Sequence, residues 1–144
     1  MRRSLTALVL GLGLAAAGLT GFAGGANQGD KKVDRRVFEL RTYHAAPGKM
    51  EALHARFRNH TCRLLQKHGM TLVGFWVPAD PTQAEQKLIY VLAFPSREAA
   101  EKSWKAFRDD PEWKAAKAAS EKDGVLVEKV ESVFLNPTDY SPLR

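Results

Sequence analysis

Eight residues in the middle of the chain, Lys87 to Phe94, restrict the architectures open to this sequence. Successive side chains of a strand point to opposite faces of its sheet. Both sets are apolar here, with Leu88, Tyr90, Leu92 and Phe94 on one side and Ile89, Val91 and Ala93 on the other. Such a strand belongs to a sheet that is buried on both faces. Since the domain's own helices can cover only one face, we expect another copy of the same sheet to cover the second.

The other sequence patterns make this strand the third of four strands, and the fourth of six main elements. The expected elements are a strand at 37–44, a helix at 47–68, a strand at 70–77, a polar turn region at 78–86, the strand at 87–94, helices begun by Ser96 and Asp110 and ended by Gly124, and a last strand at 125–135. A Pro-containing tail follows at 136–144. The order β-α-β-β-α-β predicts an α+β, ferredoxin-like domain.

Local signals set the limits of the first helix. Pro47 suits the first helical position, where its missing N–H is not needed, and Gly69 after Lys67 and His68 is a typical helix stop. At regular helical spacing His60 lies close to the buried side, so we expect a hydrogen-bonded core histidine. Cys62, the single cysteine, is expected as a small buried hydrophobe.

The first 26 residues have the pattern of a cleavable secretory signal. Arg2 and Arg3 are followed by an apolar run and then by small residues up to Ala26. The run of about 15 residues is short of the roughly 20 that span a bilayer; an uncleaved membrane anchor is the alternative. We therefore expect a signal peptide at 1–26, a flexible linker at 27–36 and a domain with its tail at 37–144. The short Gly/Ala-rich leader favours export to the periplasm or the exterior, by the general secretory or the twin-arginine route.

Charge and cysteine content exclude several classes of function. The formal net charge is +6, two units of which come from the leader, and basic residues are mixed with acidic ones along the predicted helices. This pattern indicates solvated helix faces and not a nucleic-acid surface. With one cysteine, the exported domain has no internal disulfide. We expect no stable membrane insertion once the signal is cleaved.

Several short stretches resemble the NIPSNAP family. They are Phe38-Glu39-Leu40-Arg41-Thr42-Tyr43, Pro47-Gly48-Lys49, Lys67-His68-Gly69, Gly74-Phe75-Trp76, Ser103-Trp104-Lys105-Ala106-Phe107, Asp110-Pro111-Glu112-Trp113 and Pro137-Thr138-Asp139-Tyr140-Ser141-Pro142. The resemblance implies a dimeric α+β barrel in which two ferredoxin-like sheets pack face to face. The wider group of such barrels includes cofactor-independent monooxygenases and haem-associated enzymes. The family brings no catalytic motif that can be transferred, and the mitochondrial roles of eukaryotic relatives do not fit a chain with an export signal.

Common catalytic and metal-binding motifs are missing from the sequence. No two of the four histidines stand at i and i+4 on a helix, and no H-E-x-x-H or C-x-x-C occurs. There is no G-x-S-x-G nucleophile motif, P-loop or dinucleotide fingerprint. We therefore expect no metal site and no cofactor.

The polar side of the first strand is the candidate ligand site. Glu39, Arg41 and Tyr43 share one face, opposite Phe38, Leu40 and Thr42. If Phe38 and Leu40 meet the helices, the polar face points into the barrel, where an acidic or carbonyl-bearing ligand could bind between Trp76 and Tyr90. The alternative is a structural Glu–Arg–Tyr network that needs no ligand.

Three functions remain open at this point. The first is a dimeric barrel that binds a small apolar or aromatic molecule. The second is an enzyme, similar to a cofactor-independent monooxygenase or an isomerase. The third is a protein-interaction module of the cell envelope. The sequence names neither the ligand nor the reaction.

Overall fold

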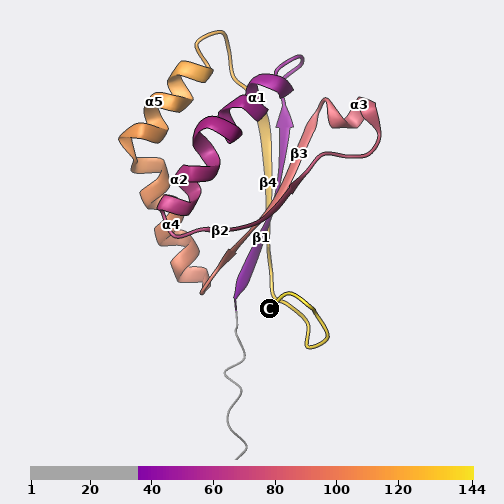
Figure 1. The fold of residues 1–144 in the computed structure, drawn as a ribbon, viewed down its shortest axis with the longest axis vertical. Coiled ribbons are helices and arrows are strands. Elements are labelled where there is room, and N and C mark those ends of the chain that lie inside the picture. The colour runs from indigo at the N-terminus through magenta and orange to yellow at the C-terminus, as the bar shows by residue number, and fades with distance from the viewer. Residues whose placement is uncertain (1–35) are drawn as a thin grey trace, which may run out of the picture. The chain divides into compact units, whose positions relative to one another are not determined.

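Four strands form an antiparallel sheet in the order β2-β3-β1-β4, with bounds β1 (Val37–Ala45), β2 (Thr71–Trp76), β3 (Lys87–Phe94) and β4 (Val127–Leu135). The computed structural model describes residues 36–144. The expected signal peptide, 1–26, and all but the last residue of the expected linker, 27–36, lie outside the described residues. Strand β3 separates β1 from β2, and β1 separates β3 from β4 (Figure 1). This is the split βαβ arrangement, so the predicted ferredoxin-like α+β fold is confirmed.

The longer helices lie on one side of the sheet (Figure 1). They are α1 (Met50–Arg56), the π-helical turn η1 (Phe57–Thr61), α2 (Cys62–Lys67), α4 (Arg97–Asp109) and α5 (Pro111–Ser120). The core forms where they meet the sheet. Its members include Leu53, Phe57, Leu64 and Leu65 from the first helical segment, Tyr90, Leu92 and Phe94 from β3, and Trp104 and Phe107 from α4.

The first helix differs from its prediction at the start. It begins at Met50 and not at Pro47, because Gly48 has a φ of +70° and so cannot belong to a right-handed helix. The C-terminal end agrees with the prediction. Gly69 takes a φ of +79°, and the Met70 N–H closes the helix by donating to the Leu65 carbonyl at 3.1 Å.

The π-helical turn η1 is the second departure. In a π-helix each N–H reaches back five residues, and the Cys62 N–H accordingly donates to the Phe57 carbonyl. The wider turn rotates the following residues around the helix axis. In this wider turn Thr61, four residues after the buried Phe57, takes the buried position, and His60 is exposed. The prediction of a core histidine at position 60 is wrong for this reason.

Side-chain caps begin the later helices as predicted. The Ser96 hydroxyl accepts from the Ala99 N–H at 3.1 Å at the start of α4, and the Asp110 carboxylate accepts from the Glu112 N–H at 2.7 Å at the start of α5. The turn region between β2 and β3, predicted as a polar turn, contains a short helix, α3 (Pro81–Ala84). Strand β4 begins two residues later than predicted.

The face of the sheet away from the helices carries a row of apolar side chains. Leu40 of β1 stands between Val91 of β3 and Val133 of β4. Trp76 pairs with Ile89 on the same face, and both Trp76 and Val133 are 52% exposed. We call this surface the open face. Strand β3 is thus apolar on both sides, as its sequence indicates, although the described helices cover only one of them.

Candidate functional site

A buried carboxylate lies on the helix-covered face of the sheet. Glu39 is 1% exposed, and its Oε2 accepts a hydrogen bond from the Trp104 indole at 2.5 Å. Its Oε1 accepts from the Ser132 hydroxyl and from Arg41 Nη1, both at 2.6 Å. Buried charges require paired and hydrogen-bonded surroundings. These three donors, from α4, β4 and β1, satisfy that requirement.

Arg41 is held as a cation beside this carboxylate. Its guanidinium stacks 4.2 Å from the centre of the Trp104 ring and lies 5.6 Å from that of Tyr43. Burial lowers the pKa of the guanidinium, but the neighbouring Tyr90, Tyr43 and Glu39 outweigh it and raise the pKa above its ordinary value. The Nε atom is buried without a hydrogen-bond partner.

Four aromatic rings continue from Arg41 toward the edge of the sheet. Tyr43 meets Tyr90 with ring centres 5.3 Å apart, and Tyr90 in turn stacks on Phe75 at 5.3 Å and meets Phe57 at 5.4 Å. Burial, followed by the nearby Tyr43, raises the pKa of the Tyr90 hydroxyl well above its ordinary value. Tyr90 is therefore neutral across the physiological pH range.

The orientation of this face is the reverse of the expected one. Glu39, Arg41 and Tyr43 point toward the helices, while Leu40 points to the open face. The reason is hydrogen bonding: α4 supplies the Trp104 N–H and β4 the Ser132 hydroxyl, so the carboxylate is satisfied beneath the helices. The arrangement agrees with the alternative of a structural network.

An apolar groove lies at the far end of the aromatic rings, beside edge strand β2. Its volume is about 400 Å³, and it is lined by Phe57, Cys62, Phe75, Trp76, Val77 and Leu88, with His54 and Arg58 also contributing. The Trp76 indole lies close over Gly74, where an added Cβ would stand 2.5 Å from the ring. Glycine at position 74 therefore provides the space that this indole occupies.

The π-helical turn shapes one wall of the groove. Phe57, Arg58 and Cys62 all line the groove and all lie in η1 or next to it. Turns of this type occur as single insertions in α-helices and often mark functional sites. Here the turn is stabilised locally, because the buried Thr61 hydroxyl donates to the Arg56 carbonyl at 3.3 Å.

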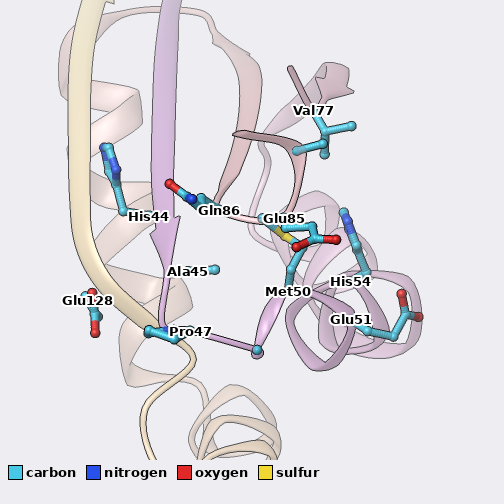
Figure 2. A pocket seen from close by; sticks show the side chains of 12 residues that line it. His44, Ala45, Pro47, Met50, Glu51, His54, Val77, Glu85, Gln86 and Glu128 are labelled. Atoms are coloured by element: carbon cyan, nitrogen blue, oxygen red, sulfur yellow. The ribbon is translucent and has the colours of Figure 1, made fainter. Parts of the chain in front are cut away.

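A second, polar pocket of about 880 Å³ adjoins the groove, and His54 and Val77 line both. Its other walls come from the end of β1, the start of α1, the loop before β3 and the start of β4. Figure 2 shows Glu85, His54 and Val77 on one side of the pocket, with His44 and Glu128 on the opposite side. Glu51 also lines this pocket, and its carboxylate accepts from Arg58 at 2.9 Å.

The structure divides the predicted site residues between two places. Glu39, Arg41, Tyr43 and Tyr90 lie together on the helix-covered face, and only Trp76 lines the groove. Phe57, Phe75 and His54 line the groove but were not predicted from the sequence. Phe57 and Phe75 resemble ordinary core residues in the sequence, and His54 carries no motif that would single it out.

Metal-ligand side chains do not gather at this site. Within residues 36–144 no group of three His, Cys, Asp or Glu side chains is placed to hold a metal ion. Cys62 is a free, half-buried cysteine, and burial raises the pKa of its thiol. No helix of the described part is long and apolar enough to cross a membrane.

Comparisons with solved structures give the same fold. A NIPSNAP family protein of unknown function from Agrobacterium tumefaciens matches with a TM-score of 0.66 and 21% identity, over 78% of this chain and 96% of that chain. Another NIPSNAP family protein from that organism matches with a TM-score of 0.63 and 27% identity, over 76% and 99%. A monooxygenase of Streptomyces coelicolor in complex with nanaomycin D matches with a TM-score of 0.51 and 13% identity, over 75% and 92%. No curated protein matches the sequence.

The family itself is established by sequence. The sequence model of the NIPSNAP family matches residues 38–142, which include every helix described above and all four strands except the first residue of β1. This confirms the resemblance found in the short sequence stretches. The chain belongs to the NIPSNAP family.

Proposed function

We propose that this protein binds a small apolar or aromatic molecule in the groove beside η1. The observation that carries the proposal is the groove itself: a space of about 400 Å³ walled by Phe57, Phe75, Trp76 and Leu88. Ligand sites in proteins typically have volumes of about 300–1,000 Å³ and mostly apolar, aromatic walls with a few polar groups. The fold also holds a small molecule elsewhere, since the monooxygenase of Streptomyces coelicolor is in complex with nanaomycin D.

Binding is favoured over catalysis by the placement of the titratable groups. An enzyme of the oxygenase or isomerase kind needs such a group, with a perturbed pKa, facing its substrate. Tyr90 has a raised pKa but is buried behind Phe57 and Phe75, and it does not line the groove. Cys62 does line the groove, but burial raises the pKa of its thiol and so disfavours the reactive thiolate. Arg41 is engaged by Glu39 and Trp104. The predicted polar site is therefore better explained as a structural network that packs against the aromatic residues of the groove wall.

Filling the groove tests the proposal. We expect native mass spectrometry of protein purified from its own host to show a retained small molecule, and Cys62→Phe, which adds a ring inside the groove, to lose it. Val125→Phe adds the same bulk at a residue that is 56% exposed and does not line the groove, and it should retain the molecule. Protein that carries nothing, and that also fails to bind 2-naphthylmethanol in equilibrium dialysis, would contradict the proposal. Equal retention by Cys62→Phe would do the same.

We propose further that the protein is exported and acts in the periplasm or outside the cell. The support is the sequence of residues 1–26, with paired arginines, a short apolar run and small residues before Asn27. Cleavage is expected between Gly24 and Asn27. N-terminal sequencing of material from the culture medium or periplasm checks this, and a mature chain that still begins at Met1 would rule it out.

The open face supports a homodimer as the working assembly. Its apolar row across β3, β1 and β4 would be covered if two copies packed sheet against sheet. A second copy of the chain is preferred to a different envelope protein as the partner on the open face. In a symmetric dimer the same surface of each copy packs against the other, so both copies bury their apolar row.

A further inference from the structure

We propose that the bound molecule is an amphipathic amine, whose apolar body lies in the groove and whose positively charged head reaches past His54 into the polar pocket. This inference rests on the proposed function, because it identifies the class of ligand for the same site. It starts from the junction between the two spaces, where His54 and Val77 line both the groove and the pocket. A molecule longer than the groove must therefore pass His54.

His54 is available to a ligand at this junction. It lies on α1, three residues before the π-helical turn begins, and its side chain is half-buried. Its imidazole makes no hydrogen bond or ion pair with any residue in 36–144. A neutral imidazole donates from one nitrogen and accepts at the other, so it can accept a hydrogen bond from an amine or a hydroxyl.

The charges beyond His54 favour a cationic head. Glu51, Glu85 and Glu128 line the polar pocket, whereas no lysine or arginine does. Glu51 is neutralised by Arg58 at 2.9 Å, and the lining His44 is engaged with Glu131 at 3.1 Å. Glu85 and Glu128 have no ion-pair partner among the described residues, so their charges remain for a ligand.

The groove provides the apolar surface that would bind the body of the amine. Phe57, Phe75 and Leu88 offer apolar surface, and the basic residue that lines this space, Arg58, is turned to Glu51. The polarity of the site thus changes at a single place, from apolar beside β2 to acidic beside α1 and β4. An anionic molecule of the same shape would have to place its charge beside Glu85 and Glu128.

Three probes with one apolar body and different heads test the inference: 2-naphthylmethylamine, 2-naphthylmethanol and 2-naphthoic acid. With the full mature chain in low salt at neutral pH, we expect the amine to bind about tenfold more tightly than the acid, since the charges of Glu85 and Glu128 act together on the head group. The alcohol should lie between them. Raising the salt concentration should reduce the preference, because exposed charges are screened.

Matched variants separate charge from shape. Glu85→Gln combined with Glu128→Gln should bring the amine and the acid to within about threefold of each other while leaving the alcohol unchanged. Glu98→Gln combined with Glu101→Gln removes two charges from α4, outside the polar pocket, and should keep the full preference. His54→Leu should weaken the amine and the alcohol by a similar factor.

The outcomes distinguish this inference from the proposed function. If all three probes bind equally, or if the acid binds best, the amine preference is wrong although the groove binds ligands. A preference that survives in the Glu85/Glu128 double variant overturns it as well. If none of the probes binds, both the inference and the proposed function are contradicted.

Discussion

Glu39 connects three separate parts of the fold through one carboxylate. Its partners are Trp104 on α4, Ser132 on β4 and Arg41 two residues along its own strand. Because the group is 1% exposed, none of these partners can be replaced by bulk water. The loss of one partner is therefore costly, whereas the loss of the pair is easier to tolerate.

We predict that Arg41→Met folds with reduced stability. The variant keeps the apolar stem against Trp104 but leaves the Glu39 charge in the core without a counter-ion, which costs about 3–5 kcal/mol in comparable buried pairs. Urea unfolding followed by circular dichroism measures the loss. Ligand retention by the folded fraction should persist, because Arg41 does not line the groove.

A double variant provides the control. Glu39→Gln combined with Arg41→Met removes both charges, so it should be more stable than Arg41→Met alone. An Arg41→Met protein as stable as the parent would mean that the ion pair contributes nothing. If a variant of unchanged stability lost the ligand, Arg41 would instead be a ligand-binding residue.

The sequence predicted the grouping of Glu39, Arg41 and Tyr43 but not the direction in which they point. Strand periodicity is enough to place alternate residues on one face. The choice between the two faces depends on distant partners, here the indole of Trp104 and the hydroxyl of Ser132, which are 65 and 93 residues away along the chain. A tryptophan in an amphipathic helix does not reveal in the sequence that its N–H will meet a carboxylate.

At the scale of the elements, η1 determines which side of the first helix faces the groove. The extra residue of the π-helical turn buries Thr61, exposes His60 and brings Cys62 to the groove wall. Regular helical spacing could not predict this, since positions i+3 and i+4 from Phe57 both lie near the buried face and spacing alone does not choose between His60 and Thr61. The caps of α4 and α5 were predictable because they depend on adjacent residues only.

We predict that Thr61→Val destabilises the π-helical turn. Valine has nearly the same shape but cannot donate to the Arg56 carbonyl, so the free energy of unfolding should fall by about 1–2 kcal/mol. Thr61→Ser keeps the hydroxyl and serves as the control for the hydrogen bond, with a smaller loss from the missing methyl group. The comparison is made by thermal unfolding of the three proteins side by side. A Thr61→Val protein more stable than Thr61→Ser would contradict the role given to the hydroxyl.

Asp110 joins the end of α2 to the start of α5. Its Oδ2 lies 2.7 Å from Lys67 Nζ and 2.6 Å from His68 Nε2, and its Oδ1 accepts from the Glu112 N–H. The hydrogen bonds from Lys67 and His68 hold the pKa of the carboxyl well below its ordinary range. A lowered folded-state pKa stabilises the fold above the ordinary aspartate pKa, and that stabilisation disappears as the pH falls toward the folded-state value.

The pH dependence of Asp110→Asn should follow from this sign. Asparagine is also a good helix cap, so the substitution removes the charge and leaves the start of α5 intact. At neutral pH the variant should melt at a lower temperature than the parent. The two melting temperatures should converge as the pH falls from about 5 to about 2, because the carboxyl of the unfolded parent chain becomes protonated first and the stabilisation by the charge is progressively lost. Melting curves that stay parallel over this range would exclude the proposed role of the Asp110 charge.

At the scale of the whole molecule, the open face is the part of the sheet whose apolar side chains a monomer would leave exposed to solvent. Leu40, Val91 and Val133 form one row across three strands, with Trp76 and Ile89 at the β2 side. Soluble monomers rarely expose a continuous apolar surface of this kind. The pattern of Lys87 to Phe94 already required cover on both sides, and the described helices provide it on one.

Val133 is the position at which the proposed homodimer is best tested. It is 52% exposed and lies in strand β4, so in a monomer a charge there should cost little. In a sheet-to-sheet dimer, Val133→Glu would place two carboxylates in an apolar interface without partners, which is strongly unfavourable. Light scattering at micromolar concentration should therefore give a dimer for the parent and a monomer for the variant. Val125→Glu introduces the same charge at a residue that is 56% exposed outside the sheet, and it should remain dimeric. A parent protein that is already monomeric at this concentration would refute the dimer, and a dimeric Val133→Glu would mean that the two copies meet through a surface other than the open face.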